Sequence, residues 1–446
     1  MMPRRPAVRP APTWRFPRPV SQQLSSGLTV DHYLLPGQRV VTLVLVVDAP
    51  LTAEPAELEG VSALTIQACD EGTETHPGTA LTEALEGCGA AVVAAGAGLN
   101  GAYLSVEVPG SRLPEALPLM AELVREPVFA ADDVARLVES RLLAIATAEC
   151  SPPAVASKAF YSALGDHRLA RPIGGDADTV ARLSREHLHA WHEAAICPER
   201  SRLIMAGDLP GDAAQWADAA FGSWTPPAAP ELPASVSPPA APPRSVLLVD
   251  RPDAAQVSLR IGTLTPTRTH EDWAALQVAN AVVGSMFGSR LNTALREERG
   301  LTYGAGSSLG PGRDAGVFLA HVECRPDSAA EAVRLALELI DVGASPITEA
   351  EVRNGIAFIT GSTPLRLDTA DAIAVLATDF TLSRVPADWF DAYMLGVSSV
   401  TAEAATAAFT RYVRPDDLVV AICGDAASIE PELQKVFPDG LGITRQ

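Results

Sequence analysis

An internal repeat is the feature of this sequence that most limits the folds it can adopt. The segments 198–208 and 415–425 both begin with proline, cross an apolar stretch and end in Gly-Asp, and they lie 217 residues apart (415 − 198). The β-branched run 40–47, shifted by the same 217 positions, gives 257–264, which overlaps a second expected strand at 256–262. Two markers that share one offset indicate a duplicated unit. We therefore predict two homologous halves with a cleft between them.

Each half has the pattern of a mixed strand and helix structure. The first half is expected to contain strands at 40–47, 91–95, 103–108 and 201–206, and helices at 61–69, 81–85, 113–125, 131–147, 154–164 and 184–194. The second half opens with strands at 245–249 and 256–262. This pattern predicts an α+β fold of two homologous α/β-sandwich domains, each a mixed sheet with helices on one face.

Proline-rich segments set the expected limits of the two halves. Residues 1–20 carry five arginines among prolines and lack the apolar core of a secretory signal, so we expect a disordered basic arm. Residues 225–243, TPPAAPELPASVSPPAAPP, are typical of a semi-rigid linker. The two domains are accordingly expected at 21–224 and 244–446.

Composition excludes several classes of function. The chain has 446 residues, of which 47% are hydrophobic, enough for two packed cores. A net charge of −20 argues against a nucleic-acid partner, and no apolar run approaches the roughly 18 residues of a membrane span. The six cysteines are scattered without C-x-x-C spacing, which predicts reduced, buried thiols and a cytoplasmic location.

One stretch, 289–303, combines a helix, a glycine stop and the start of a strand. Its helical spacing ends at Gly300, and an extended run follows. Arg296 in the last helical turn and Tyr303 in the strand can then point into one cavity. Both side chains are hydrogen-bond donors, so together they suit a peptide carbonyl or a developing oxyanion. The alternative is that Arg296 caps a surface helix and Tyr303 fills the core.

These motifs resemble the pitrilysin/insulinase family of zinc peptidases, over roughly residues 24–436. The resemblance is closer to the bacterial branch, which is similar to the mitochondrial processing peptidase and acts as two-subunit enzymes. Its residues are the segments 27–30, 60–73 and 198–208, together with Gln256 and above all SRLNTALREERGLTY at 289–303. The resemblance implies two sandwich domains that form a clam-shell with a partner subunit.

In active members of this family, an H-x-x-E-H motif on the first helix and a glutamate on a later helix hold and use the zinc ion. Counting from Gly60 and the Gly-Thr pair at 72–73 aligns this motif with 63–67. The two histidine positions are then Ala63 and Gln67, the general-base position is Ile66, and the third ligand position is Ala144. Such side chains cannot hold zinc, so we expect no metal in this chain.

The remaining histidines offer no other zinc site in the sequence. His187, His189 and His192 give the wrong order for the family motif. His189 and His192 share a helical face, but no third ligand joins them, so a solvated polar helix face is expected.

The resemblance therefore implies a non-catalytic subunit. It would pair with a homologous zinc-bearing subunit and process peptides or unfolded segments. In this interpretation Arg296 and Tyr303 act in trans, where they bind the substrate and stabilise the intermediate at the partner's zinc site. A structural scaffold subunit without a role in proteolysis is the alternative. A third option is an autonomous enzyme with a relocated metal site.

Overall fold

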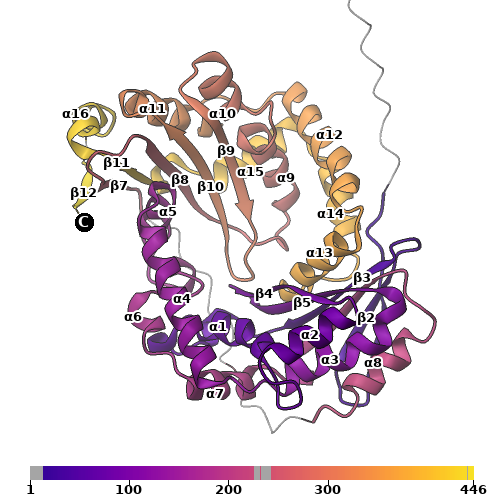
Figure 1. Cartoon of the computed structure of the whole chain (residues 1–446). Coiled ribbons are helices and arrows are strands. Elements are labelled where there is room, and N and C mark those ends of the chain that lie inside the picture. The colour runs from indigo at the N-terminus through magenta and orange to yellow at the C-terminus, as the bar shows by residue number, and fades with distance from the viewer. Residues whose placement is uncertain (1–13, 226–231, 233–242, 439, 446) are drawn as a thin grey trace, which may run out of the picture.

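The computed structural model describes residues 14–225, 232, 243–438 and 440–445, and its architecture rests on two six-stranded sheets (Figure 1). The first sheet contains β1 (Val20–Gln23), β2 (Thr29–Leu34), β3 (Val40–Val47), β4 (Ala91–Gly98), β5 (Gly101–Pro109) and β6 (Ser201–Gly207). The second sheet contains β7 (Ser245–Asp250), β8 (Val257–Thr265), β9 (Thr302–Gly310), β10 (Gly316–Cys324), β11 (Val419–Gly424) and β12 (Gly442–Arg445).

Helices follow both sheets along the chain. The first half contributes α1 (Val61–Ala68), α2 (Thr79–Gly87), α3 (Leu113–Arg125), α4 (Ala131–Glu149), α5 (Pro152–Ser162), α6 (Ala177–Val180), α7 (Arg185–Ala195) and α8 (Ala213–Phe221). The second half contributes α9 (Trp273–Asn280), α10 (Arg290–Asn292), α11 (Ala329–Ile340), α12 (Glu349–Arg366), α13 (Ala370–Leu382), α14 (Trp389–Ser398), α15 (Ala402–Tyr412) and α16 (Ala426–Val436).

Two π-helical segments and several short 3₁₀ turns complete the structure. The π-helical segments are η7 (Ala281–Ser285) and η8 (Thr293–Glu298). The 3₁₀ turns are η1 (Leu51–Ala53), η2 (Ala56–Leu58), η3 (Cys69–Glu71), η4 (Gly110–Arg112), η5 (Arg168–Ala170), η6 (Pro198–Arg200), η9 (Pro326–Ser328) and η10 (Pro415–Asp417). Within the described residues, no helix is both long enough and apolar enough to cross a membrane.

The two sheets have equivalent topologies, which confirms the predicted pair of homologous α+β units. Their strand orders are β1-β2-β6-β3-β5-β4 and β12-β7-β11-β8-β10-β9. The central pairs β2 with β6 and β7 with β11 are parallel, and the pairs that follow them are antiparallel in both sheets. The sheets differ only at the first edge, where β1 is antiparallel to β2 but β12 is parallel to β7. Strands β3 and β8 begin at Val40 and Val257, which is the offset of 217 residues that the sequence repeat predicts.

A reciprocal exchange of helices covers the second face of each sheet. Strand β3 is buried on both faces: Leu43 and Leu45 join the core beneath α1 and α3, whereas Val44 and Val46 pack against α13 of the other half. In the same way α5 of the first half packs on β8 and β11 of the second sheet. The prediction placed helices on one face only. It missed this exchange because alternation within a strand does not tell which helix covers each face.

The segment 14–20 is ordered, which differs from the predicted disordered arm at 1–20. Phe16 is only 7% exposed; Trp14 contacts Phe16 and Phe390 of α14 edge-on, and Phe16 contacts Phe390 in a tilted geometry. Burial of two aromatic rings offsets the cost of ordering a proline-rich segment. Residues 1–13 of the arm and most of the expected linker 225–243 lie outside the described residues.

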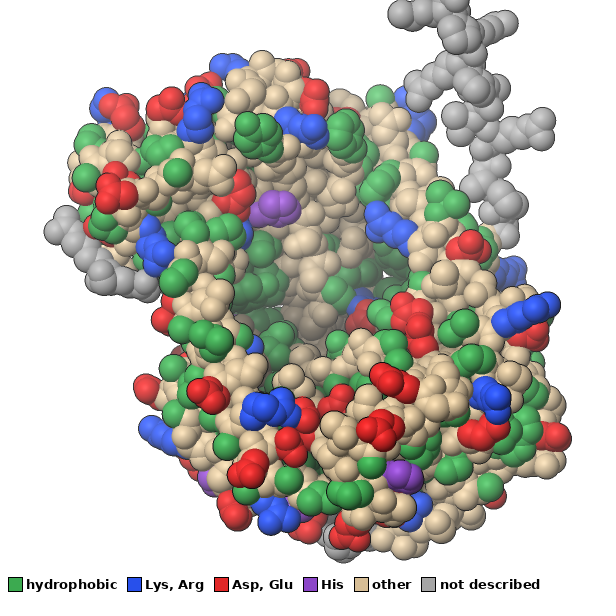
Figure 2. Space-filling model, in the orientation of Figure 1, with side chains coloured by type: hydrophobic (Ala, Val, Ile, Leu, Met, Phe, Trp, Pro, Cys, Tyr) green, Lys and Arg blue, Asp and Glu red, His purple; other side chains and the backbone are tan. Residues whose placement is uncertain are grey.

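A hollow lies between the two sheets and the helices that connect them, and Figure 2 shows it opening at the centre of one face. At one point, hydrogen bonds and an ion pair join the two sheets across this hollow. Arg313, in the turn between β9 and β10, donates to Asp48 Oδ1 at 2.6 Å and to the carbonyl of Leu382 at 2.6 Å. Its backbone amide also donates to Asn100 Oδ1 at 3.0 Å. The hairpin of the second sheet is thus fixed to the end of β3 and to the turn after β4.

Candidate functional site

Helix α1, on which the family's zinc motif would lie, is held at its N-terminus by a buried carboxylate. Glu54 accepts hydrogen bonds from the backbone amides of Gly60, at 3.3 Å, and Ser62, at 2.9 Å. These amides are among the donors that a helix start leaves without an internal partner. Burial raises the pKa of Glu54, although the bonds from Ser62 and Arg168 oppose that shift.

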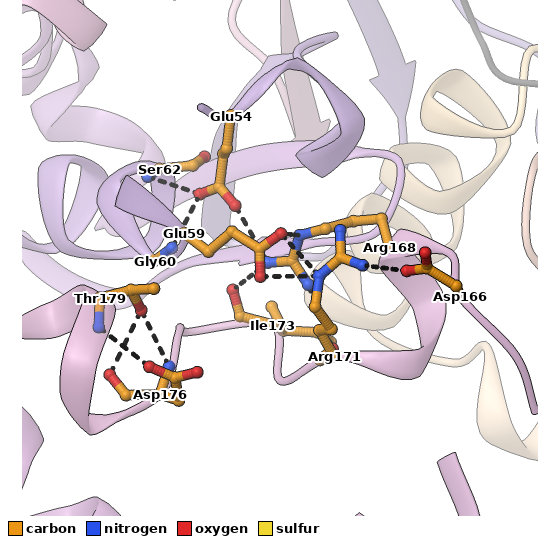
Figure 3. A network of polar contacts seen from close by, with 10 residues as sticks. All are labelled: Glu54, Glu59, Gly60, Ser62, Asp166, Arg168, Arg171, Ile173, Asp176 and Thr179. Atoms are coloured by element: carbon orange, nitrogen blue, oxygen red, sulfur yellow. Dashed lines mark hydrogen bonds and ion pairs between the residues drawn. The ribbon is translucent and has the colours of Figure 1, made fainter. Parts of the chain in front are cut away.

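The carboxylate of Glu54 belongs to an ionic cluster in which Glu54, Glu59 and Arg168 are buried and Arg171 is exposed (Figure 3). Arg168 Nη2 lies 3.0 Å from Glu54 Oε2, and Arg171 Nε lies 2.8 Å from Glu59 Oε1. Arg168 Nη2 also donates to the carbonyl of Ile173 at 3.1 Å. The side chains of Glu54 and Arg168 are 0% and 5% exposed. The cluster fixes the loop before α1 to the segment 166–176.

The four positions expected to correspond to the zinc site do not fit a zinc ion. Ala63 is half-buried and Gln67 is exposed on α1, whereas Ile66 is fully buried in the first core. Ala144 is exposed on α4, a helix that contacts α1. A methyl group, a sec-butyl group and an amide offer none of the imidazole or carboxylate donors that zinc requires. Within the described residues, no group of three or more His, Cys, Asp or Glu side chains could hold a metal ion.

The histidines of α7 are packed side chains, which corrects the expectation of a solvated polar face. His189 and His192 both contact the ring of Phe129 edge-on, at centroid distances of 5.0 and 5.6 Å. His192 Nε2 also lies 2.7 Å from the carbonyl oxygen of Val124, and burial lowers its pKa. Among the cysteines, Cys150 is exposed, whereas we had expected six buried thiols.

The stretch 289–303 begins with a short helix that changes into a π-helical turn. Ser289 caps α10 by accepting from the amide of Asn292 at 3.3 Å, and Leu291 and Leu295 are fully buried in the second core. Gly300 takes a φ of 62°, a left-handed conformation that favours glycine, and ends the helix. The predicted helix, glycine stop and strand are all present. The π-helical form of η8 was not predicted, and π-helical turns are frequent at functional sites.

An ion pair that sequence analysis missed anchors this stretch to α12. Arg290 Nε lies 2.7 Å from Glu351 Oε1 and Arg290 Nη2 lies 2.8 Å from Glu351 Oε2, a bidentate geometry. Arg290 also donates to the carbonyls of Ser345 and Pro346 at 2.6 and 3.0 Å. Glu351 in addition accepts from Thr348 in the capping box of α12. The Arg290 guanidinium lowers the pKa of Glu351 to about 2.

Arg296 and Tyr303 are both accessible, and neither is part of the core. Tyr303 is 93% exposed at the start of β9, which rules out the alternative that it fills the core. The Arg296 side chain is 40% exposed, and its guanidinium lies 5.3 Å from the ring centroid of Phe287. Phe287 is itself 71% exposed. Its ring attracts the guanidinium through a cation–π interaction, and sequence analysis gave no signal for this pairing.

The strand that carries Tyr303 lies at an edge of the second sheet, as β4 does in the first sheet. Strand β9 packs closely on the end of α9 and on η7: the hydroxyl of Ser307 lies 2.6 Å from Asn280 Oδ1 of α9, and a Cβ at Gly284 of η7 would lie 2.5 Å from the Ser307 amide nitrogen. Within the described residues, no hydrogen bond or ion pair joins Arg296 or Tyr303 to the four positions of the first half. The structure therefore places the two residue sets on separate halves.

Comparisons with known proteins match both halves of the chain. A family model described as insulinase (peptidase family M16) matches residues 35–177, and one described as the peptidase M16 inactive domain matches residues 182–357. An uncharacterised zinc protease of Mycobacterium tuberculosis (strain H37Rv) is 29% identical over 378 residues, which are 83% of this chain and 84% of that protein.

Solved structures of the same architecture extend over most of the chain. The crystal structure of a peptidase M16 inactive domain from Pseudomonas fluorescens superimposes with a TM-score of 0.83 at 24% identity, and covers 91% of this chain and 98% of that one. A chain of complex III2 from Candida albicans superimposes with a TM-score of 0.74 at 16% identity, and covers 93% of this chain and 99% of that one. The two family models together span most of both halves, and the chain belongs to the insulinase family of peptidases, peptidase family M16.

Proposed function

We propose that this chain is the non-catalytic subunit of a heterodimeric zinc metallopeptidase that processes peptides or unfolded segments. A homologous partner subunit supplies the zinc ion and the catalytic glutamate. This chain supplies Arg296 and Tyr303, which bind the substrate backbone and stabilise the tetrahedral intermediate at the partner's zinc site. The complex works in the cytoplasm, in keeping with six free cysteines, all within the described residues.

The observation that carries this proposal is the contrast between accessible donors and absent ligands. Tyr303 is 93% exposed, and its hydroxyl makes no hydrogen bond within the described structure, so the phenol can donate to an incoming oxygen. The Arg296 guanidinium is likewise accessible beside Phe287. Two positioned donors can stabilise the charge that develops on a peptide carbonyl when water attacks it. The attack itself needs a metal-bound water, which the side chains at 63, 66, 67 and 144 cannot provide.

The two edge strands support a peptide as the substrate. Strands β4 and β9 each leave one row of backbone amides and carbonyls without a strand partner. An extended peptide can add to such an edge, and it binds mainly through its own backbone. Strand β4 has the sequence AVVAAGAG, so short side chains leave room for the added peptide. Recognition of this kind favours flexible or unfolded segments over folded proteins.

A structural subunit with no role in proteolysis is the second candidate. The likeness of this chain to a chain of complex III2 shows that the same fold occurs in that assembly. A scaffold has no use for the accessible pair Arg296 and Tyr303, and would form a stable complex without binding a peptide. The difference between the two candidates lies in these two side chains alone.

The test combines the purified chain with a homologous subunit that carries an intact His-x-x-Glu-His motif. Hydrolysis of a flexible fluorogenic peptide is then measured for Arg296→Ala and Tyr303→Phe. Loss of one oxyanion donor typically lowers turnover by about 10² to 10³, and we expect falls of this size with the complex intact. Arg299→Ala is the matched control, because Arg299 lies at the end of the same helix and pairs with Glu331. Full activity in both test variants would favour the scaffold.

A further inference from the structure

A cavity of about 430 Å³ lies between α4, α5 and the segment 169–176, outside the Arg296 and Tyr303 pair. Ala144, one of the four positions that cannot hold zinc, forms part of its wall. Ile145, Val155 and Leu169 make much of the remaining lining apolar. A cavity of this size suits one large side chain together with the backbone atoms next to it.

Arg141, a half-buried arginine, lines this largely apolar cavity. Arg141 Nε donates to the carbonyl of Gly174 at 3.0 Å, and no acidic side chain in the described structure lies within ion-pair distance of its guanidinium. Burial lowers the pKa of Arg141, and no neighbouring carboxylate counteracts this effect. Burial of a cation without a counter-ion in apolar surroundings raises the free energy of the folded protein. An anion that enters the cavity would relieve this cost.

The segment 169–176 makes room for this guanidinium at Gly174. A Cβ at Gly174 would come within 2.4 Å of Arg141 Nη2 and 2.7 Å of Arg141 Cζ. The absent side chain lets the guanidinium lie directly against the backbone. The two other cations of the lining differ from Arg141, because Lys158 pairs with Glu149 at 2.9 Å and Arg171 pairs with Glu59 at 2.8 Å.

A hydroxyl group supplies a second donor to the same cavity. Tyr161 of α5 lines it, and its hydroxyl makes no hydrogen bond within the described residues. Of the charged side chains in the lining, three are cations (Arg141, Lys158 and Arg171) and two are carboxylates (Glu149 and Asp176). The cavity thus joins a largely apolar interior to Arg141, a cation without a paired carboxylate, and to the Tyr161 hydroxyl, a donor without an acceptor in the described structure. A ligand with an apolar body and a carboxylate matches both features.

We propose that this cavity binds the apolar C-terminal residue of a peptide, with the side chain in the cavity and the terminal carboxylate on Arg141. The choice of a peptide rests on the proposed function, because every cleavage of a peptide creates a new C-terminal carboxylate in the complex. The site would hold the C-terminal end of a cleaved product or of a substrate. Leucine-like residues fit the lining, whereas acidic residues do not.

The test measures binding to the purified chain alone, by fluorescence anisotropy with N-terminally labelled Ala-Ala-Ala-Leu. The acid should bind at least about tenfold more tightly than the same peptide with a C-terminal amide, because the amide cannot form the charged pair. Arg141→Gln should weaken binding of the acid by about tenfold or more and abolish its preference over the amide. Lys158→Gln removes a cation that is already paired and should change affinity by less than about threefold.

A second variant guards against loss of folding in Arg141→Gln. Gly174→Ala leaves the charge in place but pushes the flexible guanidinium out of its position, and it should also lower the preference for the acid. Circular dichroism and the melting temperature check that both variants are folded. Equal affinity for acid and amide in the wild-type chain would overturn the proposal. So would binding of decanoate without binding of the peptide acid, which would identify a fatty-acid site instead.

The outcome is independent of the test for the proposed function. Acid-specific binding that persists while Arg296→Ala and Tyr303→Phe retain full hydrolysis would reject the trans role and keep the binding site. Loss of hydrolysis in those two variants, together with no preference for the acid, would keep the trans role and reject the site.

Discussion

Helix α1 in the first half and the stretch 289–303 in the second half differ in the side chains that they present, although both are firmly held in the fold. Helix α1 keeps its buried N-terminal support, yet Ala63 and Gln67, which residue spacing aligns with the family's histidine positions, offer no zinc ligand. The stretch 289–303 keeps its support through Arg290 and also presents accessible polar side chains. Under the proposed function, the support of a site and its chemistry are separable. Three substitutions test this comparison.

The largest effect is expected where the first half retains only structural support. Arg168→Met removes the cation between Glu54 and Glu59 and leaves both carboxylates buried without it. Loss of one partner from a buried ion pair typically costs about 3 to 5 kcal/mol of unfolding free energy. Urea denaturation measures this difference. Arg112→Met, which breaks an exposed pair with Glu115, is the control and should cost less than about 1 kcal/mol.

Equal midpoints for the Arg168→Met variant and the Arg112→Met control would mean that the cluster supports nothing. Helix α1 would then have no structural support to compare with that of the stretch 289–303.

A smaller effect is expected where the second half is anchored to α12. Glu351→Gln removes the charged partner of Arg290 and should cost about 1 kcal/mol at pH 7, since both side chains are partly exposed to solvent. The folded pKa of Glu351, about 2, lies below its usual 4.5. The stabilisation is therefore present above pH 4.5 and is lost as the pH falls towards 2. Thermal melts of wild type and variant should converge across that interval.

Glu349→Gln provides the matched control, because Glu349 lies two residues away on the same helix, is exposed and forms no ion pair in the described structure. A stability difference for Glu351→Gln that stays constant from pH 7 to pH 3 would contradict the assignment of the charged pair.

The smallest effect is expected at the aromatic ring beside Arg296. Phe287→Ala removes a cation–π contact worth about 0.5 to 1 kcal/mol at an exposed site, and little core packing is lost with it. We expect turnover of the proposed two-subunit enzyme to fall about threefold at unchanged melting temperature. Phe287→Tyr keeps a ring at this position and should restore the turnover. If both variants are equally slow, the ring does not position Arg296.

Much of the architecture follows from local patterns. Strand β3 has the predicted bounds because an unbroken β-branched run must be buried on both faces. The turn at Gly300 and the 217-residue repeat were also visible in the sequence, since each depends on residues at fixed spacing. The exposure of Tyr303 could not be predicted, because a strand residue that follows a turn may face either the core or the solvent.

Contacts between distant residues account for what the sequence did not reveal. Glu54 and Arg168 are 114 residues apart, and nothing in either local pattern distinguishes a buried pair from two surface charges. The same holds for Arg290 with Glu351, 61 residues apart, and for the aromatic contacts of Phe16. The π-helical form of η8 depends on packing against β9, which periodicity does not report.

The exchange of α5 and α13 has a consequence for how the polypeptide is made. While the ribosome is still translating the second half, the outer face of the first sheet stays bare, because the helix that shields it ends only at Leu382. Val44 and Val46 of β3 thus lack their packing partners through most of synthesis. Such a nascent chain is a natural client for chaperones and prone to aggregate if translation stops early. The first sheet can be shielded only after translation has passed Leu382, whereas α5, which covers the second sheet, is made before that sheet.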